Sequence, residues 1–148
     1  MKVLLIGYGC ELRGDDAVGQ LIARTVAEWH RPDLRCLAVP SLVPELCAEM
    51  SQADGVLFVD AGAVSEVGIA ELRGRRCDAL GHTSDPANLL ALTEVVYDRK
   101  PRAWLVTVPA REFEPSLGLS ALAQAGVAAA LARIEAWLDK LALQLRPV

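Results

Sequence analysis

Short apolar runs that alternate with segments of helical period constrain the fold more than any other feature of this sequence. A run that is apolar at nearly every position is typical of a strand buried on both faces, as in parallel sheets. Five runs fit this description to different degrees, the last so weakly that we expect an edge strand: "KVLLIG", "DLRCLAV", "GVLFVDAG", "RAWLVTVP" and "GIAELR". Because strands that alternate with helices pair in parallel, the pattern predicts an α/β fold. We expect one doubly wound, mostly parallel sheet with helices on both faces.

Segments in which apolar residues recur every three or four positions separate these runs and predict helices. The first helix is expected from Asp15, the second is short and starts at Pro44, and the third is capped by Ser84 or Asp85. A long final helix is expected over 119–145. The apolar positions that define the first helix are Val18, Leu21, Ile22, Val26 and Trp29.

The composition is that of one folded domain over residues 1–148. A hydrophobic fraction of 53% with 23% charged residues excludes a disordered chain, and this length is enough to bury a core. The net charge of −4 argues against nucleic acid as a partner, because surfaces that follow phosphates carry a basic excess.

The sequence also gives an expectation for the compartment. The first apolar run ends at Gly7, too early for a signal peptide, and charged residues interrupt the apolar C-terminal segment, so no membrane span is expected. The cysteines form no C-x-x-C pair, which argues against a zinc ribbon or a dithiol redox motif: Cys10, Cys36, Cys47 and Cys77. Free thiols are typical of a reducing compartment, so we expect a cytoplasmic protein.

The stretch "GCELRGDD" follows the first run and has the glycine spacing of a phosphate-binding loop. Asp15 and Asp16 stand where such a loop needs Lys and Ser or Thr, and they would repel a phosphate. A dinucleotide-binding fingerprint would need glycine at position 12, which is Leu12. The loop is therefore expected to be a tight turn that brings a carboxylate to the sheet edge. We expect Asp15 to be the helix-start acid and Asp16 to face the site.

Ligand-type side chains follow several of the expected strands. Asp16 comes after the first, Asp60 ends "GVLFVD", and His82 precedes a helix. The carboxyl ends of parallel strands meet at one edge of a sheet, and two carboxylates with one imidazole suit a divalent cation with open coordination positions. Structural roles are the alternative: helix capping for Asp16, loop amides for Asp60 and solvation for His82.

Four blocks in order along the chain resemble the [NiFe]-hydrogenase maturation endopeptidases: "LLIGYGCELRGDDAVG", "VLFVDAG", "HTSDPANLLAL" and "FEPSLGLS". That family removes a C-terminal extension from the precursor of the hydrogenase large subunit. The resemblance implies a flattened α/β fold and a metal-recognition site formed by Asp16, Asp60 and His82. It also implies that the metal is nickel already loaded into the precursor, whose cleavage follows a metal-bound cysteine motif.

Two positions depart from the family pattern. Ala17 stands where the family usually has Gly, a mild change because a helix favours Ala. Cys10 stands where the family usually has Asn. Its thiol is either a small group that fits the turn or a soft ligand beside a nickel-probing site.

The leading hypothesis is a cytoplasmic peptidase, expected to be monomeric, whose partner is the hydrogenase large-subunit precursor. Asp16, Asp60 or a metal-bound hydroxide would act as the general base. The cofactor would be the precursor's nickel, or another divalent cation in the isolated protein. Two alternatives stay open: a small-molecule metallohydrolase with its own divalent ion, and a non-catalytic module that checks nickel and binds the precursor without cutting it.

Overall fold

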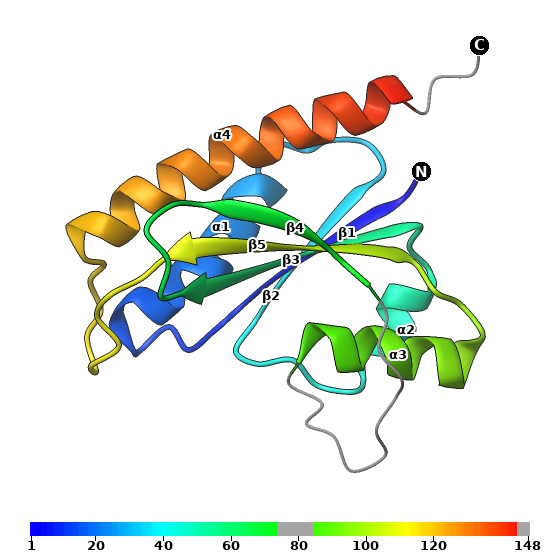
Figure 1. The fold of residues 1–148 in the computed structure, drawn as a ribbon, viewed down its shortest axis with the longest axis horizontal. Coiled ribbons are helices and arrows are strands. Elements are labelled where there is room, and N and C mark those ends of the chain that lie inside the picture. The colour runs from blue at the N-terminus through cyan, green and yellow to red at the C-terminus, as the bar shows by residue number, and fades with distance from the viewer. Residues whose placement is uncertain (74–84, 145–148) are drawn as a thin grey trace.

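A five-stranded sheet forms the centre of the computed structural model, which describes residues 1–73 and 85–144 (Figure 1). Within those residues the strand order is β2-β1-β3-β5-β4. The first four strands in that order run parallel, and β4 pairs antiparallel with β5 at the edge. The strands are β1 Val3–Tyr8, β2 Leu34–Val39, β3 Gly55–Gly62, β4 Gly68–Leu72 and β5 Arg102–Pro109. The predicted doubly wound, mostly parallel sheet is confirmed, including the weak run at its edge.

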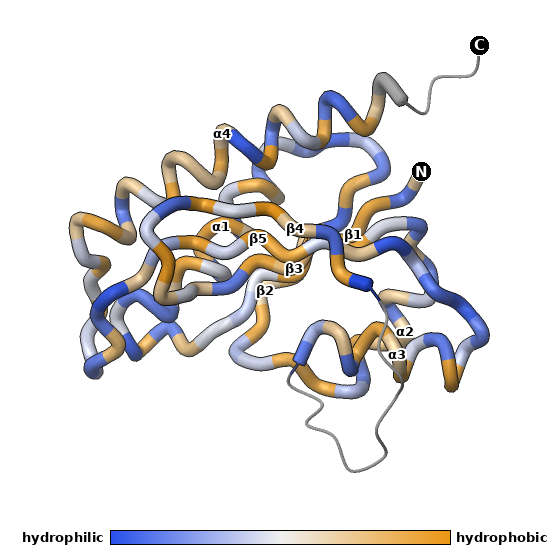
Figure 2. The backbone as a smooth tube through the Cα atoms, viewed as in Figure 1, coloured by the Kyte–Doolittle hydropathy of each residue, from blue (hydrophilic) through white to orange (hydrophobic). Residues whose placement is uncertain are grey.

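Helices cover both faces of the sheet and bury two separate cores (Figure 1). The α1/α4 core lies under α1 (Val18–Ala27) and α4 (Ala121–Gln144), and the α2/α3 core lies under α2 (Leu46–Ser51) and α3 (Pro86–Tyr97). Successive residues of β1 alternate between them, because side chains of a strand point to opposite faces. Figure 2 shows hydrophobic residues concentrated along the central strands.

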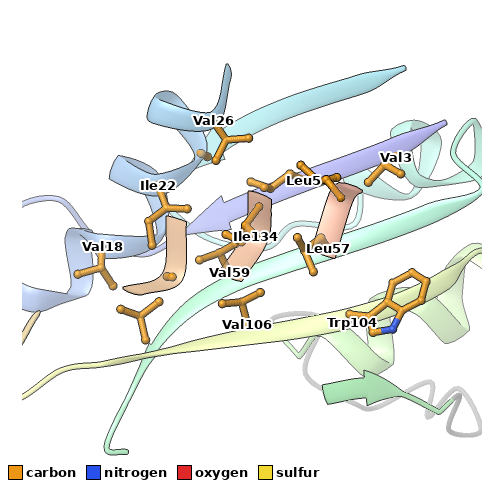
Figure 3. Packing of buried hydrophobic residues seen from close by; sticks show 14 of the residues in the cluster. Val3, Leu5, Val18, Ile22, Val26, Leu57, Val59, Trp104, Val106 and Ile134 are labelled. Atoms are coloured by element: carbon orange, nitrogen blue, oxygen red, sulfur yellow. The ribbon is translucent and has the colours of Figure 1, made fainter. Parts of the chain in front are cut away.

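The α1/α4 core is built from the apolar face that the sequence predicted for the first helix. Val18, Ile22 and Val26 pack against β1, β3 and β5, and Ile134 of α4 closes the same core (Figure 3). Leu21, one of the apolar positions that predicted this helix, lies in α1 but is 40% exposed. Position 21 lies to one side of the buried stripe formed by positions 18, 22 and 26.

The helix boundaries agree with the sequence to within a few residues. Asp85 is one of the two predicted caps of α3, and it accepts a hydrogen bond of 2.8 Å from the amide of Ala87. Pro86 is the first residue of the helix. Helix α2 begins at Leu46 instead of Pro44, and α4 begins at Ala121 instead of 119. These shifts are of the size expected where a helix begins in a turn.

Helix α4 is long and apolar enough, by length and composition alone, to cross a membrane. Those two criteria do not separate a span from a helix that belongs to a folded core. In the structure α4 packs on the sheet through one stripe of buried side chains, which consists of Ala123, Ala130, Ile134 and Leu138.

Candidate active site

The loop after β1 is a tight turn that returns to its own start. Gly9 has a φ of 140°, a conformation that side chains rarely adopt, and a Cβ there would overlap the carbonyl oxygen of Asp16. The turn ends in a short 3-10 helix, η1 (Gly14–Ala17). It brings the Asp16 carboxylate back to Cys10, whose amide donates a hydrogen bond of 2.6 Å to Asp16 Oδ2. The predicted tight turn is confirmed.

The first turn of α1 lies directly on the ends of two strands. A Cβ at Gly19 would overlap the backbone of Tyr8 and would come within 2.6 Å of the carbonyl oxygen of Val59. Only glycine allows the helix to approach β1 and β3 this closely. This contact fixes Asp16, three residues earlier, near the carboxyl end of β3, where Asp60 lies.

Asp60 lies beside Tyr8 on the neighbouring strand. Gly7 pairs with Val59 in the parallel register, so Tyr8 and Asp60 follow one residue further on. Asp60 Oδ1 accepts a hydrogen bond of 2.8 Å from the amide of Ala61, and the Tyr8 phenol is close enough to the carboxylate to affect its pKa. The Asp60 carboxylate is only partly exposed.

The pKa of Asp60 is raised above its ordinary value, mainly because burial disfavours the charged carboxylate. The nearby charge of Asp16 raises it further, whereas the hydrogen bonds from Tyr8 and Ala61 oppose the shift. Asp16 and Asp60, two of the three predicted ligands, are therefore close enough to interact. The third, His82, lies outside the described residues, as does Cys77.

Tyr8 is a site residue that the sequence reasoning missed. Burial raises the pKa of its phenol, and the charge of Asp60, the hydrogen bond to it, and the charges of Asp85 and Asp16 raise that pKa further. The hydroxyl is therefore a protonated donor surrounded by carboxylates. Its signal in the sequence was its place at the end of a strand, in line with Leu4 and Ile6 of the α2/α3 core.

Asp15 does not act as the helix-start acid that we predicted, although it lies in the first turn of η1. Its side chain is 0% exposed and makes no cap bond to η1. It accepts hydrogen bonds from the loop before α4, which comes about a hundred residues later in the chain. The donors are the amides of Arg111 (2.8 Å), Glu112 (3.0 Å) and Ser120 (2.8 Å) and the Ser120 hydroxyl (2.6 Å).

These hydrogen bonds decide the charge state of Asp15. Burial alone would raise its pKa, but the bond from the Ser120 hydroxyl and the three backbone amides outweigh burial and lower the pKa from 3.8 to about 2. Asp15 is therefore an ionised anchor between the blocks "GCELRGDD" and "FEPSLGLS". Ser120, which also accepts a bond from the amide of Ala123 at the start of α4, was missed by the sequence reasoning.

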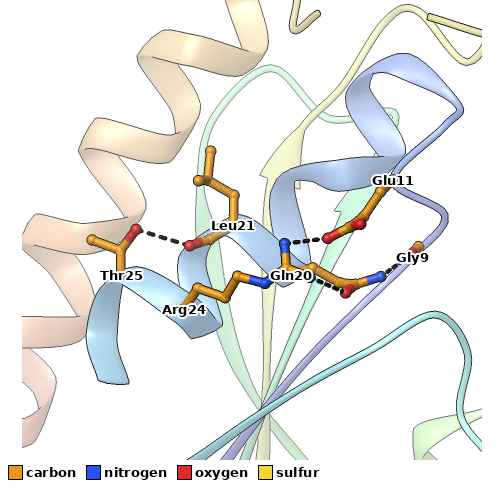
Figure 4. A network of polar contacts seen from close by, with 6 residues as sticks. All are labelled: Gly9, Glu11, Gln20, Leu21, Arg24 and Thr25. Carbon is orange, nitrogen blue, oxygen red and sulfur yellow. Dashed lines mark hydrogen bonds and ion pairs between the residues drawn. The ribbon is translucent and has the colours of Figure 1, made fainter. Parts of the chain in front are cut away.

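A polar network on α1 supports the other side of the loop (Figure 4). The buried Gln20 side chain donates a hydrogen bond of 2.6 Å from Nε2 to the carbonyl oxygen of Gly9. Its Oε1 accepts one of 3.0 Å from Arg24, which also pairs with Glu11. The loop that carries Asp16 is therefore held from α1 by Gln20 and from the later loop through Asp15.

The carboxylates at this edge suit a cation. Among the described residues, the Cys10 amide is the only donor to the Asp16 carboxylate, so its second oxygen is left for a ligand. The same part of the chain contains no group of three His, Cys, Asp or Glu side chains that could hold a metal by itself. A three-ligand site thus requires His82 and stays a prediction. The Cys10 thiol is free and partly buried, and its proposed influence on a metal also stays a prediction.

Comparison with protein-family models finds no match for this sequence, and comparison with curated proteins finds none. Solved structures, in contrast, match over almost the whole chain. The hydrogenase maturating endopeptidase HybD from E. coli superposes with a TM-score of 0.79 at 22% identity, over 95% of this chain and 93% of that one. The [NiFe] hydrogenase maturation protease HybD from Thermococcus kodakarensis superposes with a TM-score of 0.74 at 22% identity, over 93% and 99%.

A third similar structure has the same kind of name. The hydrogenase 2 maturation peptidase from Thaumarchaeota archaeon SCGC_AB-539-E09 superposes with a TM-score of 0.68 at 21% identity, over 93% of this chain and 98% of that one. The lengths correspond closely, so the likeness concerns the whole architecture and not a shared substructure. This chain has the fold of the hydrogenase maturation endopeptidases.

Proposed function

We propose that this protein is an endopeptidase that removes the C-terminal extension of a [NiFe]-hydrogenase large-subunit precursor after nickel insertion. Asp16, Asp60 and His82 would contact the nickel that the precursor carries. The observation that carries the proposal is the pair of carboxylates, Asp16 and Asp60, at one sheet edge in a fold shared with proteins named for this activity.

The nickel belongs to the substrate in this proposal, and the two acids have different tasks. Among the described residues only the Cys10 amide donates to the Asp16 carboxylate, at Oδ2, and a carboxylate held in this way suits a ligand that binds the metal. Contact with the nickel would hold the adjoining peptide segment in a fixed position and so lower the entropic part of the barrier. A precursor without nickel would lack this contact and would stay uncut.

Of the two acids, Asp60 is the better candidate for the general base, because its pKa is raised. A general base works best when its pKa lies near the working pH. In the proposed step a water molecule attacks the scissile carbonyl carbon, and its proton passes to the Asp60 carboxylate. Asp60 then gives that proton to the departing amine as the peptide C–N bond breaks. The products are the trimmed large subunit and a short free peptide.

The test is incubation of the full chain with a nickel-loaded precursor, followed by intact mass. We expect the wild type to release one C-terminal peptide from the loaded precursor and none from the nickel-free one. Asp16→Asn, Asp60→Asn and His82→Ala should each slow release by about a hundredfold or more.

Matched controls come from residues of the same type elsewhere in the chain. Asp98→Asn changes an exposed aspartate with a φ of 53°, and His30→Asn changes an exposed histidine with a φ of 50°; Asn tolerates such backbone at both. Both should trim normally. Stable complex formation without mass loss would refute cleavage and favour the non-catalytic module. Hydrolysis of small esters without a precursor would favour the metallohydrolase.

A further inference from the structure

A groove runs along α4 on the α1/α4 side of the sheet, beside the edge strand β4. Its first part is a hollow of about 390 Å³ between α4 and the residues that lead into β4, which include Glu66. Its second part is a hollow of about 410 Å³ over β4 itself. Arg133 lines both parts, so the groove is continuous. Small residues of α4 face it and leave room for a ligand: Ala125, Gly126, Ala129 and Ala136.

Two tryptophans line the second part of the groove. Trp104 of β5 and Trp137 of α4 meet edge to face, with their ring centroids 4.9 Å apart. The guanidinium of Arg102 lies 4.9 Å from the centroid of Trp104 and donates hydrogen bonds of 3.1 and 3.2 Å to the two carboxylate oxygens of Glu71. The stacking and the paired bonds hold this arginine in place. The second part therefore has a rigid aromatic base.

The second part of the groove is positively charged, although the net charge of the chain is −4. Three cations and one carboxylate line it: Arg102, Arg133, Lys140 and Glu71. Since Arg102 and Glu71 neutralise each other, Arg133 and Lys140 act on whatever enters. They lie seven residues apart on one side of α4, which is about 10 Å along the helix. A ligand with carboxylates at that spacing would complement them.

The backbone of β4 indicates which kind of anion fits. Among the described residues β4 pairs with β5 alone, so its other edge presents N–H and C=O groups that no strand of this part of the chain binds. An extended peptide binds to such an edge as an added strand, and its side chains alternate between the two faces. Those on the α4 side would lie beside Ile69 and Glu71, next to the cations. A nucleic acid has no such backbone, and the net negative charge of the chain opposes it.

We propose that this groove binds an extended, acidic segment of a partner protein, which adds as a strand to the edge of β4. Carboxylates of the segment would pair with Arg133 and Lys140, and the aliphatic parts of its side chains would lie against Trp104 and Trp137. The site does not depend on the proposed function, because none of the residues that line the groove belongs to the candidate active site.

The test measures binding of a synthetic peptide of about eight residues, in which glutamate and threonine alternate, to the full chain. Its counterpart alternates lysine and threonine. With tryptophan labelled by nitrogen-15, the three tryptophans of the chain give separate indole signals, and Trp29→Phe and Trp137→Phe identify them. The acidic peptide should shift the signals of Trp104 and Trp137 but not that of Trp29, which lies outside the groove. It should bind about tenfold or more tightly than the lysine peptide.

Charge reversal tests the two cations. Arg133→Glu combined with Lys140→Glu should weaken binding of the acidic peptide about tenfold or more, because two attractions become repulsions. The matched control is Arg99→Glu combined with Lys100→Glu, which reverses two exposed cations after α3 and changes the net charge equally. This control should bind like the wild type. Lys140→Glu alone keeps the hydrogen bond of 2.8 Å from Arg133 to the carbonyl oxygen of Val67, and it should weaken binding less.

Strand addition has its own test. Methyl groups on the backbone nitrogens of the glutamates, or instead on those of the threonines, should affect binding unequally, because only one of the two sets faces β4. Equal binding of these two peptides would overturn strand addition.

Three other results would overturn the site itself. The first is equal binding of the acidic and lysine peptides. The second is a set of groove signals, those of Trp104 and Trp137, that the acidic peptide leaves unshifted. The third is a single-stranded oligonucleotide of the same charge that shifts these signals with equal affinity, because the groove would then bind anions in general.

Discussion

Asp15 and Asp60 are both carboxylates near the same edge of the sheet, yet their surroundings shift their pKa values in opposite directions. Asp15 is fully buried and receives four hydrogen bonds, so its pKa falls to about 2. Asp60 is less buried and accepts an amide hydrogen bond from Ala61, but there burial prevails and the pKa rises. Hydrogen bonds outweigh burial at Asp15, whereas burial outweighs them at Asp60, and this balance separates an inert anchor from a group suited to proton transfer.

If Asp15 and Asp60 differ in this way, the largest effect is expected for Asp60→Asn. Cleavage should fall by about a hundredfold or more, because the proton acceptor is lost. The free energy of unfolding at neutral pH should not fall, because a buried carboxylate with a raised pKa opposes folding while it is charged. Trimming rates and urea unfolding of the same preparation measure both, and a large loss of stability would contradict the contrast with Asp15.

Asp15→Asn should show the reverse. We expect a loss of about 2 kcal/mol in the free energy of unfolding at pH 7, since a pKa shift of this size corresponds to roughly that energy. The amide also brings a donor toward groups that are themselves donors. Urea unfolding measures the change, with Asp98→Asn as the exposed control. A stability equal to wild type would show that Asp15 is no anchor.

The change in the free energy of unfolding with pH should be of similar size. The pKa of Asp15 is lower in the folded state than its ordinary value of 3.8, so its stabilisation is fully present above pH 4. It is lost as pH falls from about 4 to about 2, where the folded carboxylate takes up its proton. Asp15→Asn should therefore lose less stability than the wild type over this window. If the stability of the wild type and of Asp15→Asn changed equally with pH over this window, the lowered pKa of Asp15 would be contradicted.

Ser120→Ala should have the smallest effect, a loss of about 1 kcal/mol or somewhat more in the free energy of unfolding. The variant removes the 2.6 Å hydrogen bond to Asp15 and the cap of 3.1 Å on Ala123, but it keeps the Ser120 amide bond. Ser65→Ala, at an exposed position, is the control. In an Asp15→Asn background the Ser120 effect should shrink, because the two residues share one interaction.

Sequence reasoning located the strands and helices because their signals are local. The apolar run of β1 and the glycines that bound β3 predicted those strands, and the cap at Asp85 marked the start of α3. It also selected Asp16, which follows β1, and Asp60, which ends the apolar part of β3. The spacing did not show that Leu21 is 40% exposed, because a helical period does not show how wide the buried stripe is.

Contacts between distant segments could not be read in the same way. The partners of Asp15 lie 96 to 105 residues away, and the sequence favoured a local helix-start role. Tyr8 and Asp60 meet only because β1 and β3 pair in one particular register. No local pattern encodes that register or the loop that encloses Asp15.

By itself, the sequence determined the α/β class, the tight glycine turn and the acids that follow the strands, because periodicity and backbone restriction act over a few neighbouring residues. Only the tertiary structure decided that Asp15 is the ionised anchor and that Asp60 has a raised pKa. A carboxylate's pKa depends on how many donors surround it once it is buried, and for Asp15 and Asp60 those donors include side chains and amides brought together by folding.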